Sequence, residues 1–221
     1  MKREIIITSD GSTSIHLPEW NESYHSRHGA VQEAQHVFIK NGLSLCKGQS
    51  VSVLEIGFGT GLNAFITFLE GKQTHQQIEY VGVEGFPVSP EEVWQMNYVS
   101  QLSAEPFAGE FERMHTADWE KNVTISDAFR LTKRKQLFHE INDKSQFDII
   151  YFDAFGYRVQ PELWNAEIFT KMYEALKPGG VLVTYACRRP IKDAMKSAGF
   201  QVEKLVGPPG KREMLRGLRG E

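Results

Sequence analysis

The chain has 221 residues, of which 41% are hydrophobic and 24% charged, so it can bury one sizeable core and is most simply one globular domain. Its formal net charge of -3 lacks the strong basic excess of many nucleic-acid-binding domains, but it does not exclude a local basic patch. No apolar run is long enough to span a membrane, and Cys46 and Cys187 are too few for a disulfide framework and form no zinc pattern. We therefore expect a cytoplasmic protein with no membrane segment and no bound metal.

Residues 1–50 do not share the pattern of the rest of the chain. We expect them to form an extension with one helix, at about 30–41, that packs on a main domain at 51–221. In chain order, the main domain should begin with a strand at 51–56, a helix at 62–69 that stops at Gly71, a strand at 79–84 and a helix from Ser89 to about 102. A strand at 111–116 and a hairpin-like insertion with a short helix at about 119–141 should follow. The last part should contain a strand at 147–153, a helix at 161–176, a strand at 181–186, a helix at 191–198, and an edge pair at 200–206 and 214–218. This alternation predicts an α/β fold with a mainly parallel, seven-stranded sheet, helices on both faces, and ligands at the carboxyl ends of the strands.

The most informative segment is the buried strand that runs into the glycine-rich turn Glu55-Ile56-Gly57-Phe58-Gly59-Thr60-Gly61. A dinucleotide-binding turn needs a third glycine where this chain has Leu62, and no lysine follows the turn to hold phosphates. A carboxylate at Glu55 would repel a pyrophosphate, but it could receive the cationic end of S-adenosylmethionine. The turn therefore favours a methyltransferase, with a ligand-free connection as the alternative. Asn63, at the start of the following helix, is a further candidate for cofactor binding.

Three acidic residues follow strands of the expected sheet. Glu84 is placed where a carboxylate can accept two hydrogen bonds from ribose hydroxyls, although acids at strand ends are common. Asp118, after the expected strand at 111–116, could accept from an adenine amino group or could cap a helix. Asp153 ends a buried strand near the expected position of a transferable methyl group. A satisfied structural aspartate is the alternative there, because an unpaired buried charge is costly.

Positive charge is concentrated in the second half of the chain. Any one of these clusters could simply be a solvated face, and whether they bind a nucleic acid depends on where the fold places them. The clusters are Lys133-Arg134-Lys135, Arg188-Arg189, and Lys211-Arg212 with Arg216 and Arg219.

Several longer segments make the chain similar to a known family. The turn from Glu55 to Gly61 resembles the first motif of class I S-adenosylmethionine-dependent methyltransferases. Nearly the whole chain resembles the MnmC methyltransferase domain and its stand-alone MnmD relatives, which have a Rossmann-like fold. The segments that carry this resemblance are Tyr24-His25-Ser26-Arg27-His28-Gly29-Ala30, Gln35-His36-Val37-Phe38-Ile39, Phe152-Asp153-Ala154-Phe155, Gln160-Pro161-Glu162-Leu163-Trp164 and Gly207-Pro208-Pro209-Gly210-Lys211-Arg212-Glu213-Met214.

The resemblance implies that the chain methylates the aminomethyl group on the wobble uridine of transfer RNA, producing 5-methylaminomethyl-uridine or its 2-thio form and S-adenosylhomocysteine. The partners would then be a tRNA anticodon loop and, upstream, other enzymes that modify the wobble uridine. The flavin-dependent domain of fused MnmC proteins is absent from this sequence. Segment 186–190 departs from the lysine-glycine pair and longer basic run of relatives. The residues expected to contact the substrate are Tyr24, Ser26, Phe155, Arg188, Lys211 and Arg212.

Asp153 is the expected catalytic residue. With ordinary pKa values of about 3.9 for the carboxylate and about 10.4 for the amine, outright proton removal would cost roughly 9 kcal/mol. We therefore expect Asp153 chiefly to orient the amine, while burial and the sulfonium lower the pKa of the amine. Two other functions stay open at this point. One is methylation of a small-molecule amine, and the other is a non-enzymatic RNA-binding protein on the same scaffold.

Overall fold

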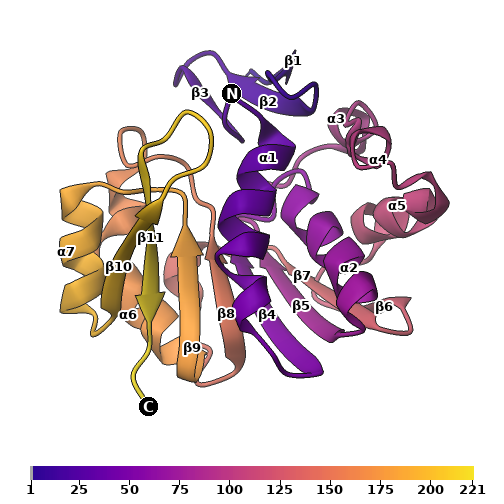
Figure 1. Ribbon diagram of the computed structural model, residues 1–221. Coiled ribbons are helices and arrows are strands. Elements are labelled where there is room, and N and C mark those ends of the chain that lie inside the picture. The colour runs from indigo at the N-terminus through magenta and orange to yellow at the C-terminus, as the bar shows by residue number, and fades with distance from the viewer. Residues whose placement is uncertain (1) are drawn as a thin grey trace.

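The computed structural model describes residues 2–221 and has a central sheet with helices on both faces (Figure 1). The sheet contains β4 (Ser50–Ile56), β5 (Gln77–Val83), β6 (Asn122–Ser126), β7 (Phe129–Arg134), β8 (Phe147–Phe152), β9 (Leu176–Thr184), β10 (Gln201–Val206) and β11 (Glu213–Leu218). In the described chain these eight strands have the order β10-β11-β9-β8-β4-β5-β7-β6. The pairs among β4, β5, β7, β8 and β9 are parallel, whereas β6 and β11 run antiparallel to their neighbours. The predicted α/β class and mainly parallel sheet are thus confirmed.

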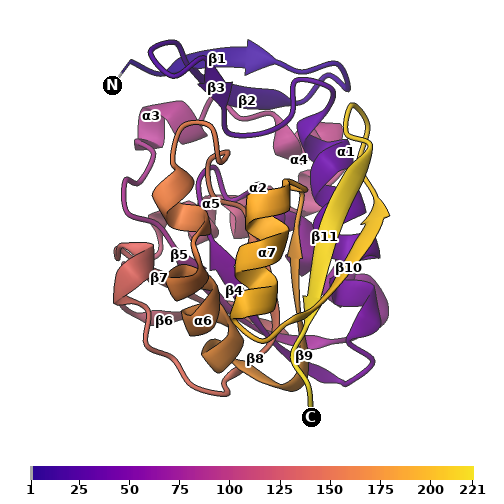
Figure 2. The same cartoon turned by 90° about the vertical axis from the view of Figure 1, so that its left-hand side faces the viewer.

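The two faces of the sheet bury separate apolar clusters. One face packs against α2 (Leu62–Thr74), α1 (Ala30–Ala34) with its π-helical continuation Gln35–Lys40, and α5 (Ala108–Thr116). The other face packs against α6 (Ala166–Ala175) and α7 (Arg189–Ser197). Figure 2 shows these two layers on opposite sides of the strands. Strands β4 and β8 are buried almost throughout because helices cover both of their faces, as is typical of central parallel strands.

Residues 111–116 are helical, so the strand predicted there is wrong. Phe111 and Met114 are both buried, and their three-residue spacing places them on one side of α5. A strand would instead have put Arg113 on the same face as Phe111. The third parallel position in the sheet is taken by β7, which pairs with β5. The expected hairpin is present as β6 and β7, but it forms the edge of the sheet instead of an addition beside it, and this gives eight strands where seven were expected.

The helix predicted from Ser89 to about 102 is interrupted. It consists of α3 (Pro90–Val93) and α4 (Tyr98–Gln101), and Ser89 caps α3 in a reciprocal capping box with Glu92, as its residue type predicts. Between them, the side chain of Asn97 accepts from the amide of Thr13 at 2.8 Å. This contact with the N-terminal segment turns the chain out of the helix.

Smaller differences occur at other element ends. Helix α2 continues through Gly71 to Thr74, so Gly71 does not end the helix as predicted. An added Cβ there would lie 3.0 Å from Ile78, so the glycine instead allows close packing against β5. The remaining short helices are η2 (Leu43–Leu45), η3 (Glu105–Phe107), η4 (Phe138–Glu140) and η5 (Pro161–Trp164).

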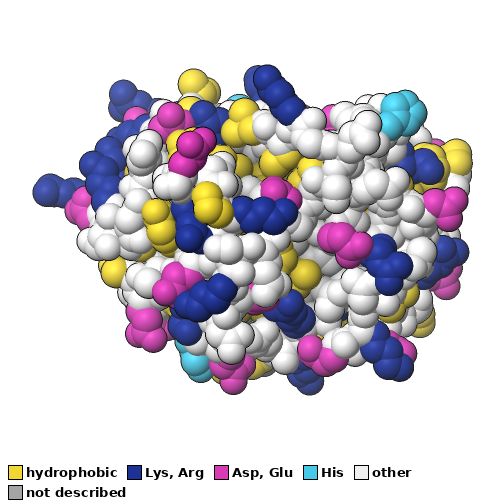
Figure 3. All heavy atoms as spheres, turned by 90° about the horizontal axis from the view of Figure 1, so that it is seen from below, with side chains coloured by type: hydrophobic (Ala, Val, Ile, Leu, Met, Phe, Trp, Pro, Cys, Tyr) yellow, Lys and Arg dark blue, Asp and Glu magenta, His cyan; other side chains and the backbone are white. Residues whose placement is uncertain are grey.

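A three-stranded antiparallel sheet, absent from the sequence-based expectation, lies above the carboxyl ends of the central strands (Figures 1 and 2). It consists of β1 (Glu4–Ile7), β2 (Thr13–Leu17) and β3 (Glu22–Ser23). Arg3, just before β1, joins it to the segment after β5 by donating to the carbonyl of Phe86 at 2.9 Å, and to α3 by donating to Glu92 at 2.9 Å. On the face seen from below, Lys and Arg side chains are interspersed with Asp and Glu (Figure 3). No helix among residues 2–221 has the length and apolar character needed to cross a bilayer.

Candidate active site

A cavity of about 920 Å³ lies between the carboxyl ends of β4, β5 and β8 and the N-terminal sheet. This volume is within the range of about 300–1,000 Å³ that is usual for small-molecule and cofactor sites. Its wall combines the glycine turn, the acids Glu84 and Asp153, and a group of aromatic residues. The position at the strand ends is the one predicted from the alternating pattern.

The glycine turn needs glycine at each of its three positions. Gly57, Gly59 and Gly61 have φ angles of 92°, 51° and 73°, which favour residues without a Cβ. An added Cβ at Gly57 would lie 2.7 Å from the carbonyl oxygen of Asp153, and one at Gly59 would lie 3.2 Å from the ring of Tyr24. The turn can therefore approach both the neighbouring strand and the cavity closely.

Glu84 follows β5 and holds the glycine turn from the side of the cavity. Its carboxylate accepts from the amide of Gly59 at 3.0 Å and from the amide of Phe86 at 2.9 Å. Two carboxylate oxygens offer about four acceptor sites, so positions are left for hydroxyl donors of a ligand. The geometry suits the ribose contact predicted for Glu84.

Asn63, at the start of α2, connects two carboxylates. Its side-chain amide donates to Glu55 at 2.8 Å and to Asp153 at 2.9 Å, and Tyr80 donates to the other oxygen of Glu55 at 2.8 Å. Glu55 is fully buried and lies outside the cavity lining, whereas Asn63 and Asp153 line it. We therefore expect Glu55 to influence a bound cofactor through Asn63, without contacting it directly.

Burial dominates the acid–base state of this network. Burial raises the pKa of Glu55 well above its ordinary value, and the hydrogen bonds from Tyr80 and Asn63 only partly oppose it. Burial, together with the charge of Glu33, raises the pKa of Asp153 to about 7, against the lowering influence of Asn63 and Lys211. Asp153 can therefore change its protonation state near neutral pH.

The side-chain oxygen of Asn63 gives a direct test of whether the cavity fits S-adenosylmethionine. This buried oxygen has no hydrogen-bond partner among the described residues, which is unusual for an amide. This hydrogen-bond acceptor, next to the Asp153 carboxyl group, suits a cationic ammonium group. The Glu84 carboxylate, elsewhere in the cavity wall, suits a ribose diol. The residues present thus fit a ligand that carries both groups.

Asp118 lies outside this cavity. It is an exposed residue, paired with Lys121 at 2.8 Å. The prediction placed it after the third strand, but the third parallel strand is β7, and the segment that follows β7 reaches the cavity through Lys135, Leu137, Phe138 and His139. Leu137 and Phe86, which are exposed at 41% and 70%, both belong to the lining.

Only some of the substrate-contact residues predicted from the resemblance line the cavity. Tyr24 and Phe155 line the cavity, where their rings make an edge-on contact with centroids 5.0 Å apart. Ser26 lies outside the lining and donates its amide to Glu33 at 2.9 Å. Lys211 is partly buried and forms an ion pair with the buried Glu33, whereas Arg188 and Arg212 are exposed.

Several residues near Asp153 were not anticipated. Glu33 is 6% exposed and falls on the apolar stripe of the helix at 30–40, between Ala30 and Val37. A charged residue on such a stripe is the signal by which the sequence could have revealed it. Tyr185, which follows β9, and His25 also line the cavity, and burial lowers the pKa of His25 to about 4, so it is neutral at pH 7.

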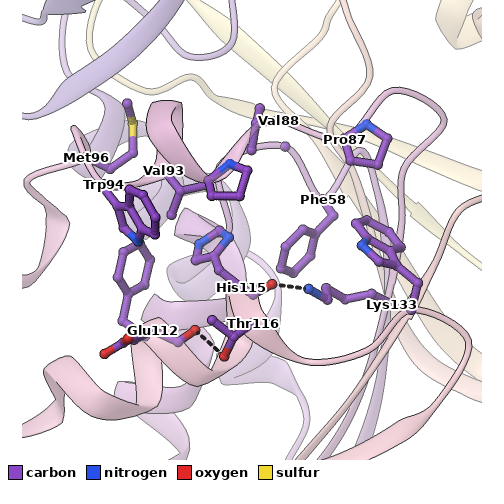
Figure 4. A pocket seen from close by; sticks show the side chains of 14 residues that line it. Phe58, Pro87, Val88, Val93, Trp94, Met96, Glu112, His115, Thr116 and Lys133 are labelled. Carbon is purple, nitrogen blue, oxygen red and sulfur yellow. Dashed lines mark hydrogen bonds between the residues drawn. The ribbon is translucent and has the colours of Figure 1, made fainter.

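A second cavity of about 490 Å³ adjoins the first beyond Phe58 (Figure 4). Lys133 lies in its wall with its ammonium 4.9 Å from the ring centroid of Trp119, and it donates to the carbonyl of His115 at 2.6 Å. That carbonyl is in the last turn of α5, where a cation stabilises the helix end. Burial lowers the pKa of Lys133 to about 8. This cluster has a structural explanation, and no group of three or more possible metal ligands was found among residues 2–221.

The chain is similar to curated proteins that are about three times as long. It is 28% identical over 219 residues to the tRNA 5-methylaminomethyl-2-thiouridine biosynthesis bifunctional protein MnmC of Delftia acidovorans, a match that covers 91% of this chain and 33% of that protein. It is 29% identical over 216 residues to the protein of the same name from Idiomarina loihiensis, with 90% of this chain and 36% of that protein covered. The chain thus spans about a third of the length of these relatives, and they confirm the resemblance inferred from its motifs.

Solved structures confirm the Rossmann-like fold. MNMC2 from Aquifex aeolicus superimposes with a TM-score of 0.79 at 21% identity, covering 98% of this chain and 69% of that one. Spermidine synthase from Thermotoga maritima gives a TM-score of 0.57 at 14% identity, with coverages of 99% and 69%. Residues 89–220 match the family described as S-adenosyl-L-methionine-dependent methyltransferase. The chain belongs to this family of enzymes, and its cofactor is S-adenosyl-L-methionine.

Proposed function

We propose that the protein methylates the aminomethyl group on the wobble uridine of tRNA, forming 5-methylaminomethyl-uridine or its 2-thio derivative. The observation that carries this proposal is the position of Asp153, which Asn63 holds at the cavity wall beside the aromatic residues Tyr24 and Phe155. The relatives named for biosynthesis of 5-methylaminomethyl-2-thiouridine support the choice of acceptor. An aminomethyl precursor requires another enzyme upstream, and a tRNA substrate places the protein in the cytoplasm.

Both parts of the chain contribute residues to the cavity wall, and we assign them different roles. Residues 51–221 supply the glycine turn, Glu84, Asn63 and Asp153, and residues 1–50 supply Tyr24 and the sheet above them. We assign the cofactor and the catalytic aspartate to the main domain. The extension at 1–50 completes the side on which the acceptor enters.

When bound, S-adenosylmethionine supplies an electrophilic methyl group whose bond to sulfur breaks with its electron pair going to sulfur. The acceptor nitrogen uses its lone pair to form the new bond to carbon, so it must be neutral, and the methylated amine then releases one proton to water. Asp153 accepts an N–H of the acceptor and aims the lone pair at the methyl group. Asn63 fixes the Asp153 carboxylate, and Glu84 fixes the ribose.

Burial makes Asp153 a better proton acceptor than an ordinary carboxylate. Its pKa of about 7 lies about 3.4 units below that of an alkylamine near 10.4, which corresponds to about 4.6 kcal/mol, compared with roughly 9 kcal/mol for an unshifted aspartate. Further lowering of the amine pKa by the buried site closes part of this gap. The main role of Asp153 is therefore to orient the amine, and its carboxylate can also accept a proton from the amine in part.

The aromatic residues Trp20, Tyr24 and Phe155 form a surface on which a nucleobase taken out of the anticodon-loop stack can pack. Trp20 and Tyr24 both contact Phe155 edge-on, at centroid distances of 5.5 and 5.0 Å. The exposed side chains of Arg188 and Arg212 are available to tRNA phosphates. Base stacking and phosphate contacts of this kind are usual where an enzyme acts on a base in a loop.

The deciding experiment uses labelled S-adenosylmethionine with tRNA that lacks the terminal methyl group, and in parallel with small primary amines. Label in the wobble nucleoside alone supports the proposal, whereas label in a small amine alone shows a small-molecule methyltransferase. Asp153→Ala should lose most of kcat while cofactor affinity changes little. Asp148→Ala, on the same strand but far from the cavity lining, is the matched control. A near-normal kcat in Asp153→Ala would refute the assignment of this residue.

A further inference from the structure

Two distant parts of the chain meet beside the Asp153 end of the cavity. Glu33 in α1 pairs with Lys211 in the turn at 207–212, between β10 and β11. Glu33 is 6% exposed, and its second oxygen accepts from the amide of Ser26 at 2.9 Å. The ammonium of Lys211 lies 4.1 Å from the ring centroid of Tyr185. The Glu33 carboxylate of this pair is therefore buried, whereas the Lys211 side chain is 31% exposed.

The pair is connected to Asp153 through Tyr185. The hydroxyl of Tyr185 donates to the carbonyl of Ala154 at 2.8 Å, one residue after Asp153, and Tyr185 lines the cavity. The turn that carries Lys211 is itself fixed, since Lys211 donates its amide to Pro208 at 2.9 Å and Gly207 donates to Arg212 at 3.1 Å. The ion pair thus has a defined position relative to the catalytic aspartate.

A second set of contacts fixes the same turn on the N-terminal segment. An added Cβ at Gly210 would lie 2.0 Å from the ring of His28, and His36 contacts the carbonyl of Val206 through a ring nitrogen at 2.8 Å. Because Lys211 is already paired, a free phosphate contact is not its main use in this arrangement. Its position instead suits an action on the site.

We propose that Glu33 and Lys211 are a positioning pair for the methyl acceptor, which holds the turn at 207–212 against Tyr185 at the Asp153 end of the cavity and sets the charge that the acceptor amine meets there. This inference rests on the proposed amine methylation. The pair is distinct from Asp153 and Asn63, because it acts through Tyr185 and through its electric field.

The charges around Asp153 explain why both members are needed. From the other elements Asp153 faces Asn63 in α2, Glu55 in β4, Glu33 in α1, Lys211 in the turn and Tyr185 after β9. The charge of Glu33 raises the pKa of Asp153, and that of Lys211 lowers it. The site therefore holds three carboxyl groups, those of Asp153, Glu33 and Glu55, and the ammonium of Lys211. This balance keeps Asp153 able to accept an N–H without trapping the acceptor as an ammonium ion.

The test compares Glu33→Gln, Lys211→Gln and the double variant by the pH dependence of kcat. Removing Glu33 should move the acid limb to lower pH, and removing Lys211 should move it to higher pH, because the two charges act on the pKa of Asp153 in opposite directions. We expect each movement to be about one unit, the usual scale of such perturbations. The double variant should return towards the wild-type profile. Lys211→Arg, which keeps the charge, should keep the profile. Glu203→Gln, which breaks the Arg216 pair in the same hairpin, is the control and should change nothing.

A carbon-13 NMR titration of the Asp153 carboxyl in the free enzyme gives the same comparison without any substrate. Shifts of opposite sign in the two single variants support the pair, whichever acceptor proves to be correct. Equal titration curves in folded variants, or losses of kcat without movement of the acid limb, would overturn the proposal. Failure of wild-type enzyme to label tRNA would count against the proposed acceptor alone.

Discussion

Asp153 should reduce the stability of the protein that uses it, and Asp153→Asn tests this. The folded-state pKa of about 7 lies above the ordinary value of 3.8, so the folded protein binds the proton more tightly than the unfolded chain does. The resulting stability is fully present below the unfolded pKa and is lost as pH rises through about 7. Asparagine keeps an oxygen that can accept from Asn63, but it carries no charge.

The size of the effect follows from the pKa. A difference of about three units corresponds to about 4 kcal/mol above pH 7, as an upper limit. Each kcal/mol shifts the Tm of a protein of this size by about 2–4 °C, so we expect Asp153→Asn to melt up to about 8–16 °C above wild type at pH 8. Near pH 4 the two proteins should melt together, and methyl transfer should fall by at least about 100-fold.

Calorimetric melting curves from pH 4 to pH 8 check this prediction, and Asp148→Asn is the control with the opposite sign. Burial alone would raise the pKa of Asp148, but hydrogen bonds from Lys177 and Ser52 outweigh burial and keep it below its ordinary value. That variant should therefore melt lower than wild type at pH 8 and approach it at low pH. A lower Tm for Asp153→Asn at pH 8, or a difference that does not vary with pH, would refute the reasoning.

Three further predictions follow from the site and its surroundings. Glu84→Ala should raise the cofactor Kd about 10- to 100-fold by calorimetry, since it removes charge-assisted hydrogen bonds, and an unchanged Kd would contradict the ribose assignment. Gly57→Ala should lower Tm by several degrees because its Cβ would meet a carbonyl, whereas Gly109→Ala, in helix α5 with open space around it, should leave Tm unchanged or raise it. Arg188→Ala should weaken tRNA binding and reduce the slope of log K against log salt by about one, and an unaltered slope would remove Arg188 from the interface.

Local sequence patterns predict the part of the candidate site that is formed by the ends of the central strands. The strand and glycine turn at 51–61, the acid at Glu84 and the buried strand ending at Asp153 each follow from a short pattern. Because these strands pair in parallel, their carboxyl ends meet at the same edge of the sheet, and no knowledge of other contacts is needed to predict this. Asn63 stays a predicted cofactor residue, but its bridge between Glu55 and Asp153 depends on the burial of Glu55, which no local pattern gives.

The missed elements depend on contacts between segments far apart in the sequence. The strand predicted at 111–116 is an exception, because Glu112, Arg113 and Met114 favour a helix and the buried residues Phe111 and Met114 have a helical spacing. That error moved the expected adenine contact to Asp118 and away from the segment after β7. Glu33 and Lys211 are 178 positions apart, so nothing in either neighbourhood indicates their pairing.

The meeting of these two segments also bears on how the enzyme folds. The contacts that hold the turn at 207–212, on the proposed acceptor side, have sequence separations of 170 and 178 residues, whereas the hydrogen bond between Gly59 and Glu84 spans only 25. Long-range contacts form late because loop closure must precede them. We therefore expect the nascent chain to acquire a cofactor cradle first, and to become selective for an acceptor only after the β10–β11 hairpin has left the ribosome.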